Sequence, residues 1–294
     1  MGFDTNAVKL LIESRDAGVN FEKIITIGRQ GLHLSRYDAN EILTSMGFTK
    51  NESNNIFSNN SFSEPFLELL GAEYIDSIDA TDYEGATITH DLNLPIPDKL
   101  KSKYSLVIDS GSLEHIFNFP IAIKNCMELI KKNGYYLGIT PTNNLLGHGF
   151  YQFSPELFYR CFNESNGFKI IKMYFFIDKK NASFYEVIDP FLVNDRVTLT
   201  NSYSSYIYIL AQRIKMVKIF EKIPQQNYYE NVVWKIGHYP IEHVNSKISS
   251  VKKYITTIVK KPFRIIYNLY KLLYLSIGTA NQNYFKKRKT NNRE

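Results

Sequence analysis

The chain has 294 residues, enough for one large domain with an appendage and short for two full domains. Apolar residues make up 44% and charged residues 22%, as in ordinary soluble globular proteins, and the 21 Tyr and 20 Phe supply a large core without a disulfide staple. The net charge is +6, but the last 44 residues carry +10 and the other 250 carry −4, so the charge of the body does not favour binding to nucleic acid.

The two cysteines, Cys126 and Cys161, show no CxxC or Cys/His spacing. We therefore expect buried free thiols in a reducing compartment, not a disulfide or a metal pair. No basic and then apolar segment precedes a small-residue cleavage site, and no window holds about 18 uncharged apolar residues. The sequence thus predicts a cytoplasmic protein without a signal peptide or a spanning helix.

The first half of the chain alternates strand and helix patterns. Lys23–Ile27 is a β-branched run that predicts a strand, and Gly28-Arg29-Gln30-Gly31 follows it as a turn. A helix is predicted over 32–46, closed by Gly47, and the Asn- and Ser-rich segment 50–63 indicates an insertion or a mobile flap. Further strands are predicted at 73–78, 86–89 and 104–108, and a helix at 112–131.

The second half continues this alternation with strands at 135–140, 168–176 and 206–212 and a helix at 155–162. Alternating strands and helices predict βαβ units and a parallel sheet, and the lack of a helix between the last two strands predicts an antiparallel final strand. The predicted fold is therefore a doubly wound α/β domain with a seven-stranded, mostly parallel sheet. We expect domain boundaries at 1–215, a connecting segment at 216–250 and a basic tail at 251–294.

Polar residues follow the ends of successive predicted strands, where open α/β sheets bind ligands. Gly28 and Gly31 let a backbone pass close to a ligand, although two glycines needed only for packing are about as good an explanation. Asp79 could accept hydrogen bonds from a ribose diol or form an Asx turn. Asp91 could accept from an adenine amine, and Asp109 comes before small residues that leave room for a substrate.

This order of strand ends, with the run YSLVIDSGSLEHI at 104–116, resembles class I S-adenosylmethionine-dependent methyltransferases. The resemblance covers approximately residues 20 to 212. Within that superfamily the segment GHGFYQFSP at 147–155 is similar to bacterial enzymes of surface-glycan or secondary-metabolite modification. One departure concerns the first loop, which is Gly-Arg-Gln-Gly where the family has Gly-x-Gly-x-Gly.

The resemblance implies that S-adenosylmethionine is the cofactor, with a role for residues at each strand end. Gly28 and Gly31 would line its methionine moiety, and Asp79 would hold the ribose hydroxyls. Further cofactor contacts are expected from Asp91 and Leu92 at the adenine edge and from Asp109 and Ser110 at the amino group or pocket floor.

Methyl transfer needs an aligned acceptor and, for a hydroxyl acceptor, a base that removes its proton. His148, flanked by two glycines, and His115, after the fourth strand, are the candidate catalytic bases, because neutral imidazole accepts protons near neutral pH. A structural or exposed role is the competing explanation for each. Tyr151 and Gln152 could orient an acceptor or pack the loop. Because the acids and histidines show no recognisable ligand spacing, no metal is predicted.

The segment 251–277 places apolar residues beside a cationic face, with Pro262 as a break, and 286–289 adds the run KKRK. This pattern predicts a helical extension that either lies on an anionic membrane surface or packs on the body or a partner subunit. The first alternative would place the protein at the inner face of the membrane.

The favoured function is O-methylation of a sugar or glycan-linked small acceptor in surface polysaccharide biosynthesis. N-methylation, or methylation of a phosphorus-linked group, is an alternative within enzymes. A methyltransferase-like scaffold without catalysis is an alternative of another class, and Asp79, Asp91 and Asp109 argue against it. A nicotinamide oxidoreductase is disfavoured because the third glycine of its fingerprint is missing.

Overall fold

The computed structural model describes residues 2–58, 62–193, 199, 201–233 and 285–287. Its strands are β1 (Gly2–Phe3), β2 (Lys23–Ile27), β3 (Gly31–Leu32), β4 (Tyr74–Asp79), β5 (Ile88–Thr89), β6 (Tyr104–Ser110), β7 (Ile130–Asn143), β8 (Phe168–Ile177), β9 (Tyr185–Val187), β10 (Ser205–Arg213) and β11 (Phe285–Lys287). Its α-helices are α1 (Thr5–Asp16), α2 (Arg36–Ser45), α3 (Lys50–Asn55), α4 (Glu64–Leu69), α5 (Phe119–Leu129), α6 (Pro155–Cys161) and α7 (Pro190–Val193). Short helical turns are η1 (Asp98–Leu100), η2 (Leu113–His115), η3 (Glu164–Asn166) and η4 (Tyr228–Val233).

The main sheet has the order β11-β9-β8-β10-β7-β6-β2-β4-β5. Strands β5, β4, β2, β6 and β7 are parallel to one another, whereas β10 is antiparallel to both β7 and β8. The parallel α/β sheet and its antiparallel final strand are therefore confirmed. Strands β9 and β11 extend the seven predicted strands at one edge, and β11 lies within the segment for which a helical tail was predicted.

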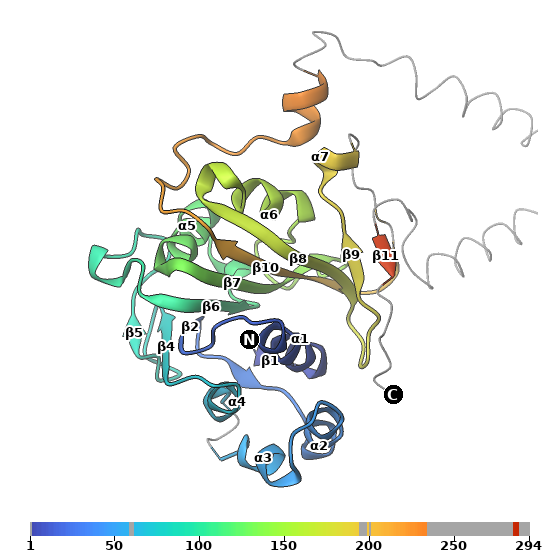
Figure 1. The fold of residues 1–294 in the computed structure, drawn as a ribbon. Helices are drawn as coiled ribbons and strands as arrows, with labels where there is room; N and C mark the ends of the chain where they lie inside the picture. Colours follow the sequence, from blue (N-terminus) through green and yellow to red (C-terminus); the bar gives the residue numbers. More distant parts are fainter. Residues whose placement is uncertain (1, 59–61, 194–198, 200, 234–284, 288–294) are drawn as a thin grey trace, which may run out of the picture.

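Helices cover both faces of the sheet (Figure 1), and the alternation of strand residues explains why. On β2, Ile25 joins the core that includes α5 and α6, whereas Ile24 joins the core that includes α1, α2 and α4. On β6, Val107 joins the first of these cores and Leu106 joins the second. The sheet is thus buried from two sides, which holds its strand ends in fixed positions.

Helix α1 was not predicted, although its local signals are clear once the structure is known. The Asp4 side chain accepts a hydrogen bond from the Ala7 amide at 2.7 Å and so caps the helix. Strand β1 precedes this cap and pairs in parallel with β3, so that Gly2 lies opposite Gly31. This two-stranded sheet brings the N-terminal segment next to the loop that follows β2.

Two predicted helices were wrong for local reasons. The helix predicted at 32–46 begins only at Arg36, because Ser35 caps it through the Asp38 amide at 3.0 Å and residues 31–32 form β3. The helix predicted at 112–131 is divided into η2 and α5, since Pro120 begins a new helix after Asn118.

The Asn- and Ser-rich segment predicted as a flap contains the helix α3. Its first turn has a complete capping box: the Thr49 hydroxyl accepts from the Glu52 amide, and the Glu52 carboxylate accepts from the Thr49 amide. Asn and Ser are weak helix formers, and the capping box offsets this weakness locally.

Cys126 and Cys161 are buried free thiols, as predicted. The described part of the chain holds no helix that is long and apolar enough to cross a membrane. The basic segment 251–294 lies outside the described residues except for β11, so the amphipathic helix expected there stays a prediction.

Candidate functional site

A cavity of about 230 Å³ lies where the carboxyl ends of β6, β7 and β8 meet the start of α1. His33 directly follows β3, His115 ends the turn η2 after β6, and His148 lies in the loop after β7. The other residues around the cavity are Gly2, Asp4, Ala7, Ser110, Gly111, Ile139, Phe176, Asp178 and Tyr206. The two histidines predicted as catalytic bases therefore face one cavity.

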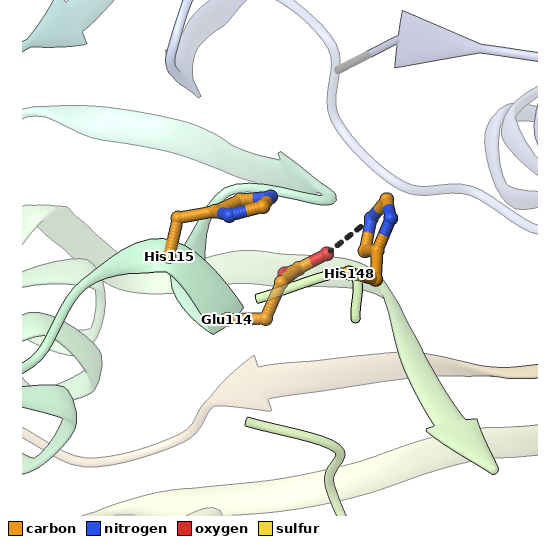
Figure 2. Close-up of side chains that lie close together, drawn as sticks. All are labelled: Glu114, His115 and His148. Atoms are coloured by element: carbon orange, nitrogen blue, oxygen red, sulfur yellow. Dashed lines mark ion pairs between the residues drawn. The ribbon is translucent and has the colours of Figure 1, made fainter. Parts of the chain in front are cut away.

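Glu114 lies between these two histidines, as Figure 2 shows, and forms a cluster with them. Its Oε1 atom is 3.5 Å from Nε2 of His148, and the centroids of the His115 and His148 rings are 5.3 Å apart. Glu114 is completely buried, whereas the side chain of His148 is 42% exposed. One buried acid is thus shared by two accessible imidazoles.

Burial controls the protonation of this cluster. Removal from water raises the pKa of Glu114 above its ordinary range, and the negative charge of nearby Asp109 raises it further. Burial likewise raises the pKa of Asp109, although hydrogen bonds from the Ser112 and Leu113 amides oppose the shift. The pKa of His115 is lowered by burial and by the electrostatic effect of the neighbouring His148 imidazole. His115 is therefore neutral near pH 7, as a base or a metal ligand must be.

Two acidic residues, Asp4 and Asp178, also line the cavity. Asp4 caps α1, and Asp178 follows β8. Burial and the charge of Asp4 raise the pKa of Asp178, and His148 opposes this shift. The Tyr206 hydroxyl also faces this region, with its pKa raised to about 12 mainly by burial. These groups offer hydrogen-bond acceptors to a polar or cationic molecule.

Gly28 and Asp79 lie side by side at the neighbouring strand ends, since β2 and β4 are parallel and in register. Gly28 has a φ of 68° and donates its amide to the Ile78 carbonyl at 2.8 Å. Asp79 is partly exposed, and one carboxylate oxygen accepts from the Ala80 amide at 2.6 Å. Its second oxygen can receive a further donor.

Other parts of the protein contact the remaining residues of the first loop. Gly31 pairs with Gly2 on one side and with Phe62 on the other. The Gln30 side chain is buried and donates to the Ile27 carbonyl at 2.6 Å. Arg29 donates to Glu64 at 2.6 Å and stacks on the Phe62 ring at 3.8 Å. Gly28 is also buried, and its carbonyl accepts from the Gln30 side chain at 3.4 Å.

The other residues predicted to bind the cofactor lie in different environments. The exposed Asp91 accepts from the amide and side chain of Asn93, which forms an Asx turn. Leu92 is 5% exposed and belongs to the core. Asp109 is fully buried below η2, while Ser110 lines the cavity and donates to the Gly2 carbonyl at 3.0 Å. The structure does not bring these four residues together around one cavity.

Tyr151 and Gln152, predicted to orient an acceptor, form hydrogen bonds with backbone groups of the protein. The Tyr151 hydroxyl donates to the Phe117 carbonyl at 2.6 Å, and Oε1 of Gln152 accepts from the Leu145 amide at 2.8 Å. Neither residue lines the described cavity.

Sequence reasoning missed several residues of the site. Asp4, His33, Asp178 and Tyr206 come from four separate segments, and no spacing in the sequence connects them. Glu114 was not among the site residues predicted from the sequence. Its position directly before His115 and its complete burial become informative only when the loop after β7 is in place.

A scan against protein-family models finds no match, and no curated protein matches the chain. Among solved structures, the YcgJ protein from Bacillus subtilis covers 73% of this chain and all of its own, with 9% identity and a TM-score of 0.39. A SAM-dependent methyltransferase from Aquifex aeolicus covers 72% of this chain and 99% of its own, with 9% identity and a TM-score of 0.33. The trans-methyltransferase CalH in complex with SAH covers 71% and 55%, with 12% identity and a TM-score of 0.37. Similarity at this level supports no argument, and the fold assignment rests on the chain's own strand order.

Proposed function

We propose that the protein is an S-adenosylmethionine-dependent methyltransferase whose acceptor binds in the cavity beside Glu114. The observation that carries this proposal is the strand order, with β10 inserted in reverse between β7 and β8. This is the sheet implied by the resemblance of 104–116 to class I methyltransferases. In such a sheet the ligand sites lie at the carboxyl ends of the parallel strands, where both Asp79 and the cavity are found.

Gly28 and Asp79 fit a nucleoside cofactor. The positive φ of Gly28 turns the backbone away at the end of β2, which allows close approach of a ligand. The free oxygen of Asp79 can accept from a ribose hydroxyl. Because Gly31 is paired on both sides, we assign the close approach to Gly28 alone.

Held by Gly28 and Asp79, the cofactor would supply an electrophilic methyl group with its sulfur as the leaving group, and the acceptor would gain the methyl group and lose a proton. The cavity aligns the acceptor, and His115 or His148 is the nearest group that can take that proton. The loops after β6 and β7 hold both imidazoles at this cavity.

The acceptor we propose is a sugar or glycan-linked hydroxyl, supported by the hydrogen-bonding groups Asp4, Asp178 and Tyr206 around the cavity. The two carboxylates equally favour a cationic amine, so N-methylation is the second candidate function. A panel of sugar nucleotides, glycans and amines, with transfer of labelled methyl as the readout, separates the two.

The test of the cofactor assignment is a calorimetric titration with S-adenosylhomocysteine. We expect binding to the wild type and a loss of about 1–3 kcal/mol in Asp79→Ala, the scale of hydrogen bonds to a charged group. Asp82→Ala is the matched control, because Asp82 is exposed in the following turn. Absence of binding to the wild type would favour the scaffold alternative, and equal affinity in both variants would remove Asp79 from the site.

A further inference from the structure

Glu114 is a buried acid that lacks the usual compensation. Its side chain is 0% exposed, and neither carboxylate oxygen has a partner of standard hydrogen-bond geometry among the described residues, although the nearby Thr140 hydroxyl lowers the pKa of Glu114 slightly against the effect of burial. An ionised carboxylate removed from water is costly unless hydrogen bonds, an opposite charge or a metal ion compensate it. The ion pair with His148 spans 3.5 Å, which is long for a charge-assisted hydrogen bond.

The donor atoms around Glu114 have the spacing of ligands for a shared cation. One carboxylate oxygen and one nitrogen from each of His115 and His148 all lie within 4.8 Å of one another. Bonds from a first-row metal to such donors measure about 2.0–2.2 Å, so two ligands of one ion lie at most about 4.4 Å apart. Small rotations of the exposed imidazole of His115 close the remaining difference.

The backbone is built to bring these groups together. The Phe150 and Tyr151 amides donate to the Glu114 carbonyl at 2.8 and 3.2 Å, which fixes the loop after β7 against η2. A Cβ atom on Gly149 would lie 2.8 Å from that carbonyl oxygen and 3.2 Å from Cγ of Glu114. Only a glycine permits this approach, and His148 is the residue immediately before it.

We propose that Glu114, His115 and His148 bind one divalent transition-metal ion at the edge of the cavity. Two imidazole nitrogens and one carboxylate suit Zn²⁺ or Fe²⁺, whereas Mg²⁺ prefers oxygen donors. Three protein ligands leave coordination positions for water or an acceptor atom. This differs from the absence of a metal expected from the sequence, where Glu114 was not counted as a ligand.

The site also changes the role of the two histidines. Imidazole nitrogens that bind a metal are not free to accept a proton. Coordination would instead lower the pKa of a hydroxyl acceptor, which would release its proton to water. The metal site itself does not depend on the proposed methyl transfer. Metal binding is measured without cofactor or acceptor, and S-adenosylhomocysteine binding is measured separately, so either proposal can fail alone.

The experiment titrates the chelator-treated full-length protein with Zn²⁺ and, in a second series, with Mg²⁺. We expect one equivalent of Zn²⁺ to bind at the cluster, and Mg²⁺ to bind at least about 100-fold more weakly. Glu114→Gln and His148→Ala should each weaken binding by at least about 100-fold, more than the loss of an outer-shell partner. His90→Ala is the control, because His90 contacts the Leu94 carbonyl away from the cluster.

A Co²⁺ titration followed by visible absorption provides a second readout, since the spectrum reports the ligands directly. Thermal unfolding shows whether each variant is folded, and Glu114→Gln conserves the shape of a buried side chain. The proposal is overturned if the wild type binds no Zn²⁺ in the micromolar range. It is equally overturned if folded Glu114→Gln protein binds like the wild type, or if His90→Ala weakens binding as much as His148→Ala.

Discussion

Glu114 and Asp109 make stability depend on pH in the metal-free protein. Both have a pKa raised by burial, so the unfolded chain releases their protons at lower pH than the folded chain does. These two groups contribute their full stabilisation of the folded state below their ordinary pKa values, 3.8 for Asp109 and 4.5 for Glu114. This stabilisation is lost as the pH rises through their raised pKa values in the folded protein. The free energy of unfolding should therefore fall from pH 5 toward pH 8.

This residue-scale prediction is tested by urea unfolding at several pH values in the presence of a chelator. Each unit of pKa shift corresponds to about 1.4 kcal/mol, and Glu114→Gln should remove the share of the pH dependence that belongs to Glu114. Glu164→Gln, at an exposed position, should keep the wild-type slope. A slope in Glu114→Gln as steep as that of the wild type would show that Glu114 does not titrate in this range.

At the scale of elements, the loop after β7 and the turn η2 act as one unit because of Gly149. An added Cβ would lie 2.8 Å from a backbone oxygen of Glu114, so Gly149→Ala must displace the loop. We expect a destabilisation of about 1–3 kcal/mol, the usual cost of overpacking.

Gly147→Ala is the matched control in the same loop, since a Cβ there meets nothing within 4 Å. It should leave the free energy of unfolding nearly unchanged or raise it slightly, because alanine restricts the unfolded chain. Urea unfolding of both variants is the measurement. Equal stabilities would mean that the contact between the loop and η2 is not tight in solution.

The strands could be predicted from the sequence far better than the helices. Runs such as Lys23–Ile27 are buried on both faces, so their pattern is continuous and their ends lie within a few residues of the observed ones. Strand β3 forms because it pairs with β1. The turn η2 ends early because the loop after β7 binds its backbone. No local pattern reports such contacts.

The same distinction holds for the site. His115 and His148 follow neighbouring strands, so their approach could be predicted from the parallel order of β6 and β7. The buried state of Glu114 could not, because it requires the Phe150 and Tyr151 amides to clamp its backbone. For Asp91, the Asx turn with Asn93 occupies one carboxylate oxygen, whereas such a turn was expected from the sequence only at Asp79.

At the scale of the whole molecule, the charge is divided between a body of −4 and a tail of +10. We expect the full-length protein to sediment with anionic vesicles and to be released by salt. Each Lys near such a surface contributes about 1 kcal/mol, so neutralising four tail lysines should weaken binding about 10³-fold. The substituted positions are Lys252, Lys253, Lys260 and Lys261, each changed to Gln.

The control variant changes four exposed lysines of the body to Gln: Lys99, Lys103, Lys132 and Lys169. It should sediment as the wild type does. Equal losses in the two variants would attribute the attraction to overall charge, and no vesicle binding by the wild type would contradict membrane contact by the tail.

The reversed position of β10 has a consequence for synthesis on the ribosome. Strand β8 leaves the ribosome before β10, yet it lies next to β7 only through β10, which bonds to both. Until residue 213 has emerged, the nascent chain therefore exposes the edges of β7 and β8, whose native partner is still missing. Such edges are templates for aggregation, so a translational pause or a stop codon between 178 and 204 would expose this protein to misassembly far more than one placed shortly after β10.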